Sequence, residues 1–153
     1  MQNLGSSNIT LRPAIGADES FILKLEQVCL QKQVLELLGR WVPRPGMGAG
    51  FPNSSRLIQL GGKNIGCLTL TNDERDIHID QLYLVPETRG LGIGTQIVSE
   101  LIARTEEDAL TLKVSLFANN PHRRFFEKLG FTVARSTSNR ILMERPSRLP
   151  ERH

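Results

Sequence analysis

The sequence is poor in the residues that mark several classes of protein. Its 153 residues include two cysteines, one tryptophan and one tyrosine. Cys29 and Cys67 are too few for a disulfide framework or a cysteine-based metal site, so we expect two buried thiols and no metal. No apolar run reaches the roughly 18 residues of a membrane span, and no signal peptide pattern opens the chain. We therefore expect a cytoplasmic protein that does not bind membranes.

The charge balance is also modest. The 19 basic and 16 acidic side chains leave a net charge of +3, and aromatic residues make up 5% of the chain. Nucleic-acid binding needs stronger charge or stacking aromatics, so we expect no nucleic-acid partner. A small ligand with several phosphates remains compatible with this charge. The length predicts one domain spanning residues 1–153.

The first third of the chain alternates between regular and irregular patterns. Residues 8–13 read as a strand, and Asp18 is a suitable N-cap for a helix. Apolar residues at helical spacing continue to Gly39, with a second helix after a break near Gln31. Residues 40–55 are rich in proline and glycine, which predicts a long loop.

Alternating apolar residues then predict a three-stranded meander. The strands are residues 56–60, 65–71 and 77–85. In the third strand, Ile77 and Ile79 are apolar at odd positions, whereas Leu82 and Leu84 are apolar at even ones. A regular strand cannot place both pairs on one face. Either a bulge lies near residues 80–81, or the strand is buried on both faces.

The rest of the chain completes a mixed α/β pattern. The predicted elements are a helix around residues 97–102, a strand over 112–116, a helix from Asn120-Pro121 to Gly130, and a hairpin of 132–134 with 140–144. Helices and antiparallel strands in this order predict one α/β domain with a mixed sheet.

A glycine-rich loop joins the third strand of the meander to the following helix. It reads Arg89-Gly90-Leu91-Gly92-Ile93-Gly94. Glycines let backbone N–H groups approach a ligand, and the helix N-terminus adds a partial positive charge. The Rossmann pattern would need a glycine at Thr95, and a P-loop would need Gly-Lys-Ser/Thr. The loop therefore predicts a pyrophosphate site of another kind, with a plain tight turn as the alternative.

Two segments resemble motifs of the GCN5-related N-acetyltransferases (GNAT). Residues 84–94 are similar to motif A, in which Arg or Gln precedes x-x-Gly-x-Gly. Asn119 and the run Phe126-Glu127-Lys128-Leu129-Gly130-Phe131 resemble motif B. The resemblance covers about residues 8–145, which would form the domain core, and leaves 146–153 as a tail. It implies a GNAT fold, with a mostly antiparallel mixed sheet flanked by helices on both faces.

The resemblance also implies a cofactor and its contacts. Members of this family bind acetyl-coenzyme A through backbone groups of the loop and of the strand before it. On this chain the implied cofactor contacts are Leu82, Tyr83, Leu84, Arg89, Gly90, Leu91, Gly92, Ile93, Gly94, Thr95, Asn119 and Phe126. Arg123 and Arg124 either meet coenzyme phosphates or are solvated. Trp41 lies where the family forms its acceptor wall, with ordinary packing as the alternative.

One position departs from the family pattern. Phe126 stands where a tyrosine often protonates the departing thiolate, and phenylalanine has no proton to give. A thiol pKa of about 8.5 makes the thiolate a tolerable leaving group at pH 7. An alkyl ammonium of pKa about 10.4 lies about 3.4 units from deprotonation, or about 4.6 kcal/mol. A general base therefore matters more than a general acid.

The sequence offers several candidates for that base and does not choose among them. His78 and Asp80 lie in the strand leading to the loop, where some relatives carry a base. The alternative is that His78 is an exposed strand residue and Asp80 shapes the bulge. Glu26 of the first helix is a third candidate. Tyr83 is a further polar candidate and a possible substitute acid, although packing is its alternative role.

These observations together predict an N-acetyltransferase. We expect an amine of a small molecule or peptide to attack the acetyl thioester directly in a ternary complex. We expect neither cysteine to lie near the motifs, so a covalent acetyl-cysteine route has no support. The alternative function is a coenzyme A-binding regulatory module without transferase activity. Edge strands and the final hairpin leave a homodimer possible.

Overall fold

The computed structural model describes residues 2–3, 8–41 and 54–148. The predicted loop over residues 40–55 and the predicted tail over 146–153 lie mostly outside these ranges. The chain forms two compact units, which are described in turn. The first comprises Met1–Thr69 and Gln81–Ile97, and the second comprises Leu70–Asp80 and Val98–His153. The single domain expected from the chain length stays a prediction.

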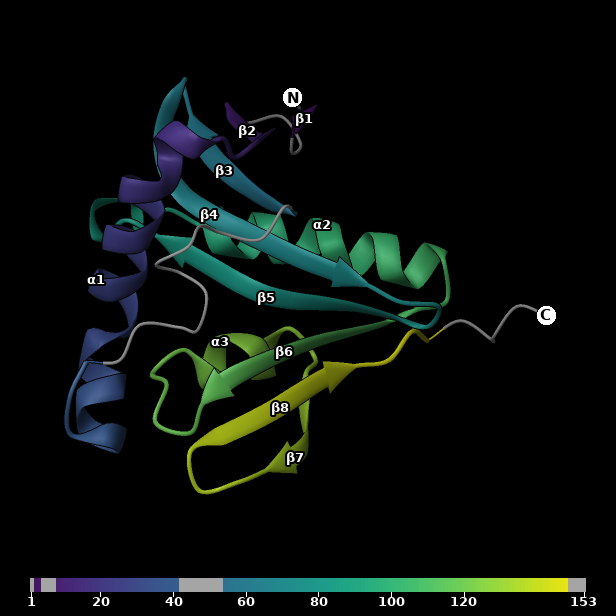
Figure 1. Ribbon diagram of the computed structural model, residues 1–153. Coiled ribbons are helices and arrows are strands. Elements are labelled where there is room, and N and C mark those ends of the chain that lie inside the picture. The colour runs from purple at the N-terminus through teal and green to yellow at the C-terminus, as the bar shows by residue number, and fades with distance from the viewer. Residues whose placement is uncertain (1, 4–7, 42–53, 149–153) are drawn as a thin grey trace. The chain divides into compact units, whose positions relative to one another are not determined.

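The first unit is built on antiparallel strands (Figure 1). Three strands belong to it entirely: β1 (Gln2–Asn3), β2 (Ile9–Pro13) and β3 (Ser55–Leu60). Two strands are divided between the units: β4 (Lys63–Asn72) belongs to the first unit up to Thr69, and β5 (Asp76–Leu84) belongs to it from Gln81. They lie in the order β1-β2-β3-β4-β5. The strands predicted from alternating apolar residues are confirmed within one or two residues at their ends, whereas the two-residue β1 was not predicted.

A two-residue turn joins β3 to β4. Gly61 and Gly62 have φ of 57° and 85°. Hairpins with two-residue loops favour turns that need positive φ, which glycine adopts without steric cost. The register shifts between Ile58 and Gln59, and beyond this shift Ser55 lies opposite Thr69 and Leu57 opposite Cys67 in the paired strands. This register brings two hydroxyl side chains together in the interior.

Helix α1 (Glu19–Leu38) is continuous, so the predicted break near Gln31 is wrong. The helix ends at Gly39, which has φ of 78° and donates its N–H to the Leu35 carbonyl at 3.0 Å, as predicted. Asp18 occupies the N-cap position, but its carboxylate does not cap the helix. It accepts hydrogen bonds from the Arg12 guanidinium and the Ile15 N–H, all at 2.8 Å.

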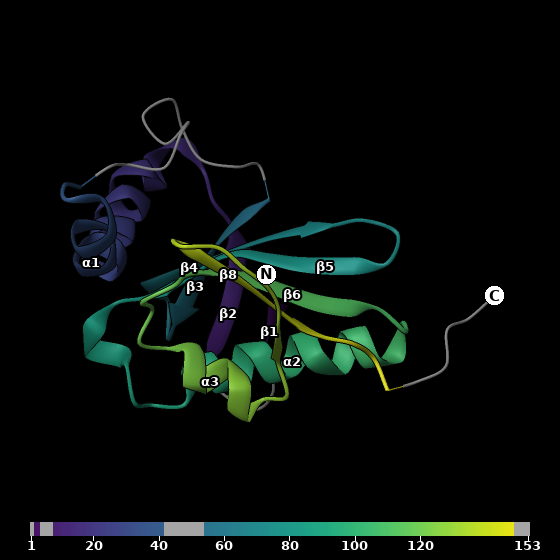
Figure 2. The ribbon, with the colours of Figure 1, turned by 90° about the horizontal axis from the view of Figure 1, so that it is seen from below.

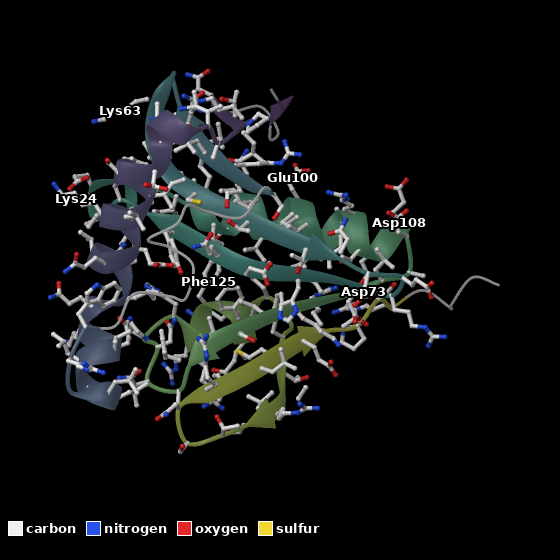
Figure 3. The ribbon with its side chains drawn as sticks, viewed as in Figure 1. Lys24, Lys63, Asp73, Glu100, Asp108 and Phe125 are labelled. Carbon is white, nitrogen blue, oxygen red and sulfur yellow. The ribbon has the colours of Figure 1, made fainter. Side chains whose placement is uncertain are left out.

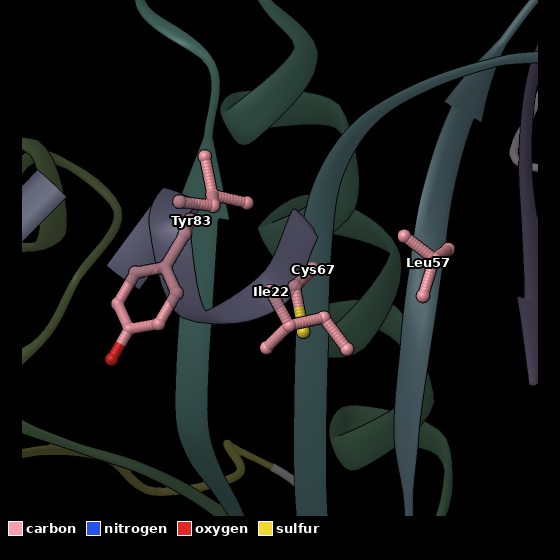
Figure 4. Packing of buried hydrophobic residues seen from close by; sticks show 5 residues of the cluster. Ile22, Leu57, Cys67 and Tyr83 are labelled. Carbon is pink, nitrogen blue, oxygen red and sulfur yellow. The ribbon is translucent and has the colours of Figure 1, made fainter. Parts of the chain in front are cut away.

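The strands of the first unit bury side chains on both faces. Helix α1 covers one face (Figure 2), where a cluster of buried residues joins it to β3, β4 and β5. The cluster consists of Ile22, Leu25, Leu57, Cys67 and Tyr83 (Figure 4). Ile58 and Leu68 have the opposite strand parity and are also buried. Lys24 lies on the exposed side of α1 and is labelled in Figure 3.

The second unit contains the mixed part of the sheet. Its strands lie in the order β4-β5-β6-β8-β7, with β6 (Thr111–Phe117), β7 (Thr132–Ser136) and β8 (Arg140–Arg145). β5 and β6 pair in parallel, and β8 pairs antiparallel with both β6 and β7. A parallel pair needs a crossover, which α2 (Ile93–Glu107) provides. Figure 2 shows α2 and the short α3 (Arg123–Lys128) on the same side of β6 and β8.

Strand β5 shows an uninterrupted alternation of burial. Ile77, Ile79, Gln81 and Tyr83 are buried, and the residues between them are less buried. The buried series therefore includes the polar side chains of Gln81 and Tyr83, whose burial the apolar pattern of the sequence did not predict. The pairing described for β5 with β6 covers Asp76 to Ile79 and is regular. The predicted bulge near residues 80–81 would fall outside these pairs, so it stays a prediction.

Hydrogen bonds from polar side chains fix a turn and the C-terminal segment of the second unit. Asp73, labelled in Figure 3, accepts the N–H groups of Arg75 and Asp76 at 2.9 Å in the turn after β4. Glu106 of α2 accepts Arg145 at 2.7 Å, and its carboxylate also accepts the Ser147 hydroxyl at 3.3 Å. These bonds attach the segment after β8 to the end of α2.

Candidate functional site

The glycine-rich loop follows β5 in the first unit and leads into α2. A 3-10 helix, Pro86–Thr88, separates the strand from the loop. Gly90 and Gly92 have φ of 82° and 81°, and α2 begins at Ile93. The Gln96 N–H donates to the Gly92 carbonyl at 3.0 Å, which is the first turn of the helix. The N–H groups of the residues before Gln96 lie at a helix N-terminus, where such groups have no acceptor one turn back.

The glycines of this loop are required by backbone conformation and not by crowding. A Cβ added at Gly90 or Gly92 would meet no heavy atom within 4 Å. The left-handed φ values nevertheless disfavour any residue with a side chain. The loop therefore combines turned backbone with open space beside it. Such a backbone at a helix N-terminus suits an anion, because its N–H dipoles and the helix dipole act together.

Thr88 fixes the start of the loop. Its side chain is buried, its hydroxyl donates to the Val85 carbonyl at 2.9 Å, and its N–H donates to the same oxygen at 3.0 Å. Val85 in turn donates its N–H to the Ile65 carbonyl of β4 at 2.8 Å. The loop is thus anchored to the sheet through one well-bonded turn, so its backbone is held in place before any ligand arrives.

Arg89 connects the loop to helix α1 through a cysteine. Its guanidinium donates to the Cys29 sulfur at 3.3 Å, and the Cys29 thiol donates to the Leu84 carbonyl at 3.5 Å. The expectation that neither cysteine lies near the motifs is therefore wrong for Cys29. Burial raises the pKa of the Cys29 thiol, and the Arg89 charge opposes this only in part. A neutral thiol is a poor nucleophile, so a covalent route still has no chemical support.

The end of β5 lies close against β4. A Cβ added at Gly66 would collide with the Tyr83 carbonyl oxygen, so only glycine permits this approach. Leu82 and Leu84 are half-buried, and Tyr83 is 9% exposed. Figure 4 shows the Tyr83 ring beside β5, with its hydroxyl pointing away from Ile22 and Cys67. The hydroxyl therefore belongs to a polar part of the interior.

That polar part is centred on Glu26, which is 1% exposed. Its Oε2 atom accepts the Gln81 Nε2 at 3.1 Å and the Tyr83 hydroxyl at 3.2 Å. Gln81 accepts the Thr69 hydroxyl at its Oε1 atom, and Thr69 lies 2.9 Å from the Ser55 hydroxyl. We call these five residues the Glu26 network. It joins α1, β3, β4 and β5 within the first unit.

The directions of the hydrogen bonds in the network follow from its composition. The Gln81 amide gives its NH₂ to Glu26, so its oxygen must face a donor, which is Thr69. Thr69 has one hydroxyl proton and uses it there, so Ser55 donates to Thr69. Ser55, Thr69 and Gln81 therefore donate along one chain that ends at Glu26, and Glu26 also accepts the Tyr83 hydroxyl. This arrangement suits an ionised carboxylate at Glu26, since a carboxylate accepts and does not donate.

Sequence reasoning found two of these five residues. Glu26 and Tyr83 were candidates, whereas Gln81, Thr69 and Ser55 were missed. Gln81 shares the strand parity of Ile77 and Ile79, and this parity was the available signal that its side chain is buried. Thr69 and Ser55 lie in strands rich in apolar residues, and nothing in their local sequence marks them.

The remaining candidates belong to the second unit. His78 is half-buried and pairs in register with Lys113, whose Nζ lies 3.2 Å from the Asp76 carboxylate. Asp80 is exposed. Glu26 is the candidate base that lies in the same unit as the glycine loop.

The two candidates from motif B also belong to the second unit. Asn119 follows β6 and is half-buried. Phe126 is 5% exposed, and its ring packs edge-on against Phe125 at 5.0 Å and Phe131 at 5.3 Å between centroids. The predicted packing of Phe131 on the last turn of this helix is confirmed, since the Phe131 N–H also donates to the Phe126 carbonyl at 3.1 Å.

Among the helices of the described residues, none combines the length and apolar character of a membrane span.

Curated proteins similar to the chain are N-acetyltransferases. One stretch is 42% identical over 48 residues to a 5-NmdU N-acetyltransferase of Pseudomonas phage PaMx11, covering 31% of this chain and 34% of the relative. Another is 30% identical over 92 residues to an uncharacterized N-acetyltransferase of Methanocaldococcus jannaschii, covering 56% of this chain and 57% of the relative. The chain thus matches between about a third and just over half of each relative's length.

The fold is shared with solved acetyltransferase structures. The PaiA N-acetyltransferase of Thermoplasma acidophilum, solved in complex with coenzyme A, superposes with a TM-score of 0.69 at 14% identity. The superposition covers 90% of this chain and 98% of that one. The family model described as an acetyltransferase (GNAT) domain matches residues 53–133, more than half of the chain. The chain therefore belongs to the GNAT acetyltransferase family and has its mixed α/β fold.

Proposed function

We propose that the protein is an N-acetyltransferase that uses acetyl-coenzyme A and a primary amine. The observation that carries this proposal is the glycine loop, in which left-handed Gly90 and Gly92 directly precede the N-terminus of α2. Membership of the GNAT family and the coenzyme A complex of PaiA support the same assignment. The acceptor would be a small-molecule or peptide amine, which attacks the acetyl group directly in a ternary complex.

The residues of the first unit fit this coenzyme. Backbone N–H groups from Arg89 to Thr95 would hold its pyrophosphate, because they lie at a helix N-terminus beside open space. The backbone of Leu82 to Leu84 would bind the extended arm and the acetyl carbonyl. Asn119 and Phe126 remain proposed contacts by their match to motif B. Bound in this way, the coenzyme supplies an activated acetyl thioester, and the protein supplies position and fixed dipoles.

The proposal is tested by titrating the protein with acetyl-coenzyme A in a calorimeter. Gly92→Ala forces a side chain into a left-handed position and should weaken binding about tenfold or more, since the strain costs about 1–2 kcal/mol and shifts the loop. Gly62→Ala is a matched control, because its φ of 85° resembles the 81° of Gly92 and its Cβ also meets nothing within 4 Å. It should bind normally. Equal affinity in all three proteins would contradict the proposed site.

A second function is favoured by one observation. Phe126 has no hydroxyl, and its ring is buried between Phe125 and Phe131. A protein that kept the cofactor site and lost a proton donor would serve as a coenzyme A-binding regulatory module. This alternative predicts normal acetyl-coenzyme A binding with no acetylated product from peptide α-amines, lysine, polyamines or aminoglycosides.

Cytoplasmic location and a homodimer also stay proposals. The five residues of β7 are exposed and lie at the edge of the second unit's sheet, which supports pairing between copies there. Arg135 lies beside a register shift in β7, a feature that disfavours such pairing. Sedimentation of the protein at several concentrations would decide between monomer and dimer.

A further inference from the structure

We propose that Tyr83 relays protons between the acceptor amine and the buried Glu26 carboxylate. This inference rests on the proposed function and deepens it, because it assigns the base that the sequence left open. Glu26 lies in the same unit as the glycine loop, and Tyr83 belongs to the strand segment that leads directly into that loop. The carboxylate and the phenol are joined by a hydrogen bond of 3.2 Å.

Burial explains why a relay is needed. Glu26 is 1% exposed, so an amine cannot contact its carboxylate directly without displacing other residues. Tyr83 is 9% exposed and contacts the carboxylate through its hydroxyl. Figure 4 shows this hydroxyl turned away from the apolar cluster. Because Tyr83 lies in the strand segment that leads into the glycine loop, it is the member of the pair that we place beside the ligand.

The rest of the Glu26 network keeps the carboxylate ready to accept a proton. Gln81 donates to the same Oε2 atom that Tyr83 contacts, and Thr69 fixes the Gln81 amide in that orientation. A hydrogen bond to a carboxylate stabilises its ionised form and fixes its position. Gln81 and Thr69 are positioning residues in this scheme, since they act through Glu26.

The proton balance of the relay is simple. The alkyl ammonium first gives one proton to the Tyr83 oxygen, while Tyr83 gives its own proton to Glu26 Oε2. The neutral nitrogen then forms its bond to the acetyl carbon, and the resulting adduct releases a second nitrogen proton to solvent. The bond from the acetyl carbon to the coenzyme sulfur then breaks, and the same path run backwards delivers one proton to that sulfur. Tyr83 and Glu26 end in their starting states. The products are the amide, the free thiol and one proton released to solvent, with no other reactant needed.

The relay also accounts for Phe126. Where a tyrosine is missing from motif B, the proton that the departing sulfur needs must come from another group. Tyr83 is the only tyrosine of the chain, and it already holds the hydrogen bond to Glu26. One pair would thus serve first as base and then as acid.

The test compares four proteins with two nitrogen nucleophiles. The proteins are wild type, Tyr83→Phe, Glu26→Gln and Thr71→Val, and release of the coenzyme thiol is followed. One nucleophile is an alkyl amine taken from a panel of lysine, spermidine and a short peptide. The other is acetyl hydrazide, which is neutral at pH 7 and needs little help from a base. Thr71 is an exposed residue of β4 outside the Glu26 network, so its variant controls for general disturbance of the strand.

With the alkyl amine, Tyr83→Phe and Glu26→Gln should each lower kcat about 100-fold or more, the usual size of a general acid–base contribution. The KM for acetyl-coenzyme A should stay unchanged, and the double variant should be no slower than either single one. With acetyl hydrazide the loss should shrink to about tenfold or less, since only the acid step remains. Thr71→Val should stay close to wild type with both nucleophiles.

Two results would overturn the relay. The first is an alkyl-amine kcat for Tyr83→Phe near that of wild type, and the second is an equal loss of rate with both nucleophiles, as a purely structural role requires. Tyr83→Phe keeps the ring in the core, so it decides the matter even where Glu26→Gln does not fold. A wild-type protein that turns over no nucleophile would instead contradict the proposed function and the relay with it. Active wild type with an equally active Tyr83→Phe contradicts the relay alone.

Discussion

Each unit of the molecule holds a carboxylate that accepts several hydrogen bonds, and the two differ in their surroundings. Glu26 of the first unit is 1% exposed and accepts from the neutral donors Gln81 and Tyr83. Glu106 of the second unit has a side chain that is 24% exposed and accepts from Arg145, Ser147 and the Arg148 N–H. One carboxylate lies among the strands of the core, and the other lies at a helix end.

This difference teaches what each cluster does. Glu106 faces a cation and solvent, so its charge is easily accommodated, and its bonds attach the segment after β8 to α2. A buried carboxylate depends on the hydrogen bonds that its neighbours supply, and those neighbours depend on it. The Glu26 network therefore links the geometry of α1, β4 and β5 next to the glycine loop. The following predictions test that contrast.

The largest effect on stability is expected from Glu26→Leu. The substitution leaves the Gln81 amide and the Tyr83 hydroxyl without their carboxylate acceptor in a buried site, which should cost about 2–5 kcal/mol of unfolding free energy. Urea denaturation followed by circular dichroism measures this loss. Glu106→Leu is the matched variant and should lose clearly less. Similar losses in the two variants would show that burial does not separate the two carboxylates.

A smaller effect is expected from Thr69→Val. The new side chain keeps the shape of threonine but removes the donor to Gln81, so the Gln81 oxygen is left buried and unsatisfied at a cost of about 1–3 kcal/mol. Thr71→Val makes the same change two residues along β4, where the side chain is exposed. That control should unfold like wild type. Equal urea midpoints for both variants would contradict the described network.

Sequence and structure agree best where the pattern is local. Alternation predicted β3 and β4, and Gly39 marked the end of α1, because strand pairing and helix termination depend on nearby residues. The glycine loop was predictable for the same reason. The break near Gln31 was predicted from apolar spacing, yet α1 stays continuous, and Val28, Leu35 and Leu38 of its stripe are exposed.

The parts of the site that depend on long-range contacts could not be predicted. The Cys29 sulfur meets Arg89, which lies 60 residues away in the sequence, and Glu26 meets Gln81, which lies 55 away. No local pattern records such pairs. The burial of Gln81 was also not predicted, because the apolar residues at 82 and 84 indicated that the even-numbered positions of this segment face the core.

Acid conditions should weaken both units through ion-paired carboxylates. Hydrogen bonding to Arg12 lowers the pKa of Asp18 in the first unit, and hydrogen bonding to Arg145 lowers the pKa of Glu106 in the second. Because each folded pKa lies below the unfolded value of about 3.9 or 4.3, each pair stabilises the fold above that value and loses its effect as pH falls through the folded pKa. Thermal melts from about pH 5 down to about pH 2 cover the range in which these carboxylates become protonated, and they should show a shallower decline for Asp18→Asn and Glu106→Gln than for wild type. If the melting temperature of both variants fell with pH as steeply as that of wild type, these ion pairs would not contribute to the pH dependence of stability.

The smallest effect is expected from Cys29→Ala. Burial raises the pKa of the Cys29 thiol, so it stays protonated at neutral pH and serves no covalent step. Acetyl transfer by the variant should remain within about threefold of wild type, because only the weak contacts with Arg89 and Leu84 are lost. Rapid modification of Cys29 by iodoacetamide at pH 7, with loss of activity, would instead indicate a reactive thiolate.

The most direct test of the central claim is to follow both products of acetyl transfer in one reaction. Wild-type protein is mixed with acetyl-coenzyme A and the amine panel, and free thiol and acetylated amine are measured together by absorbance and mass spectrometry. The account predicts one acetylated amine formed for each thiol released, with both signals reduced together in Gly92→Ala. Tight binding of acetyl-coenzyme A with no acetylated amine would contradict it and would favour the regulatory module.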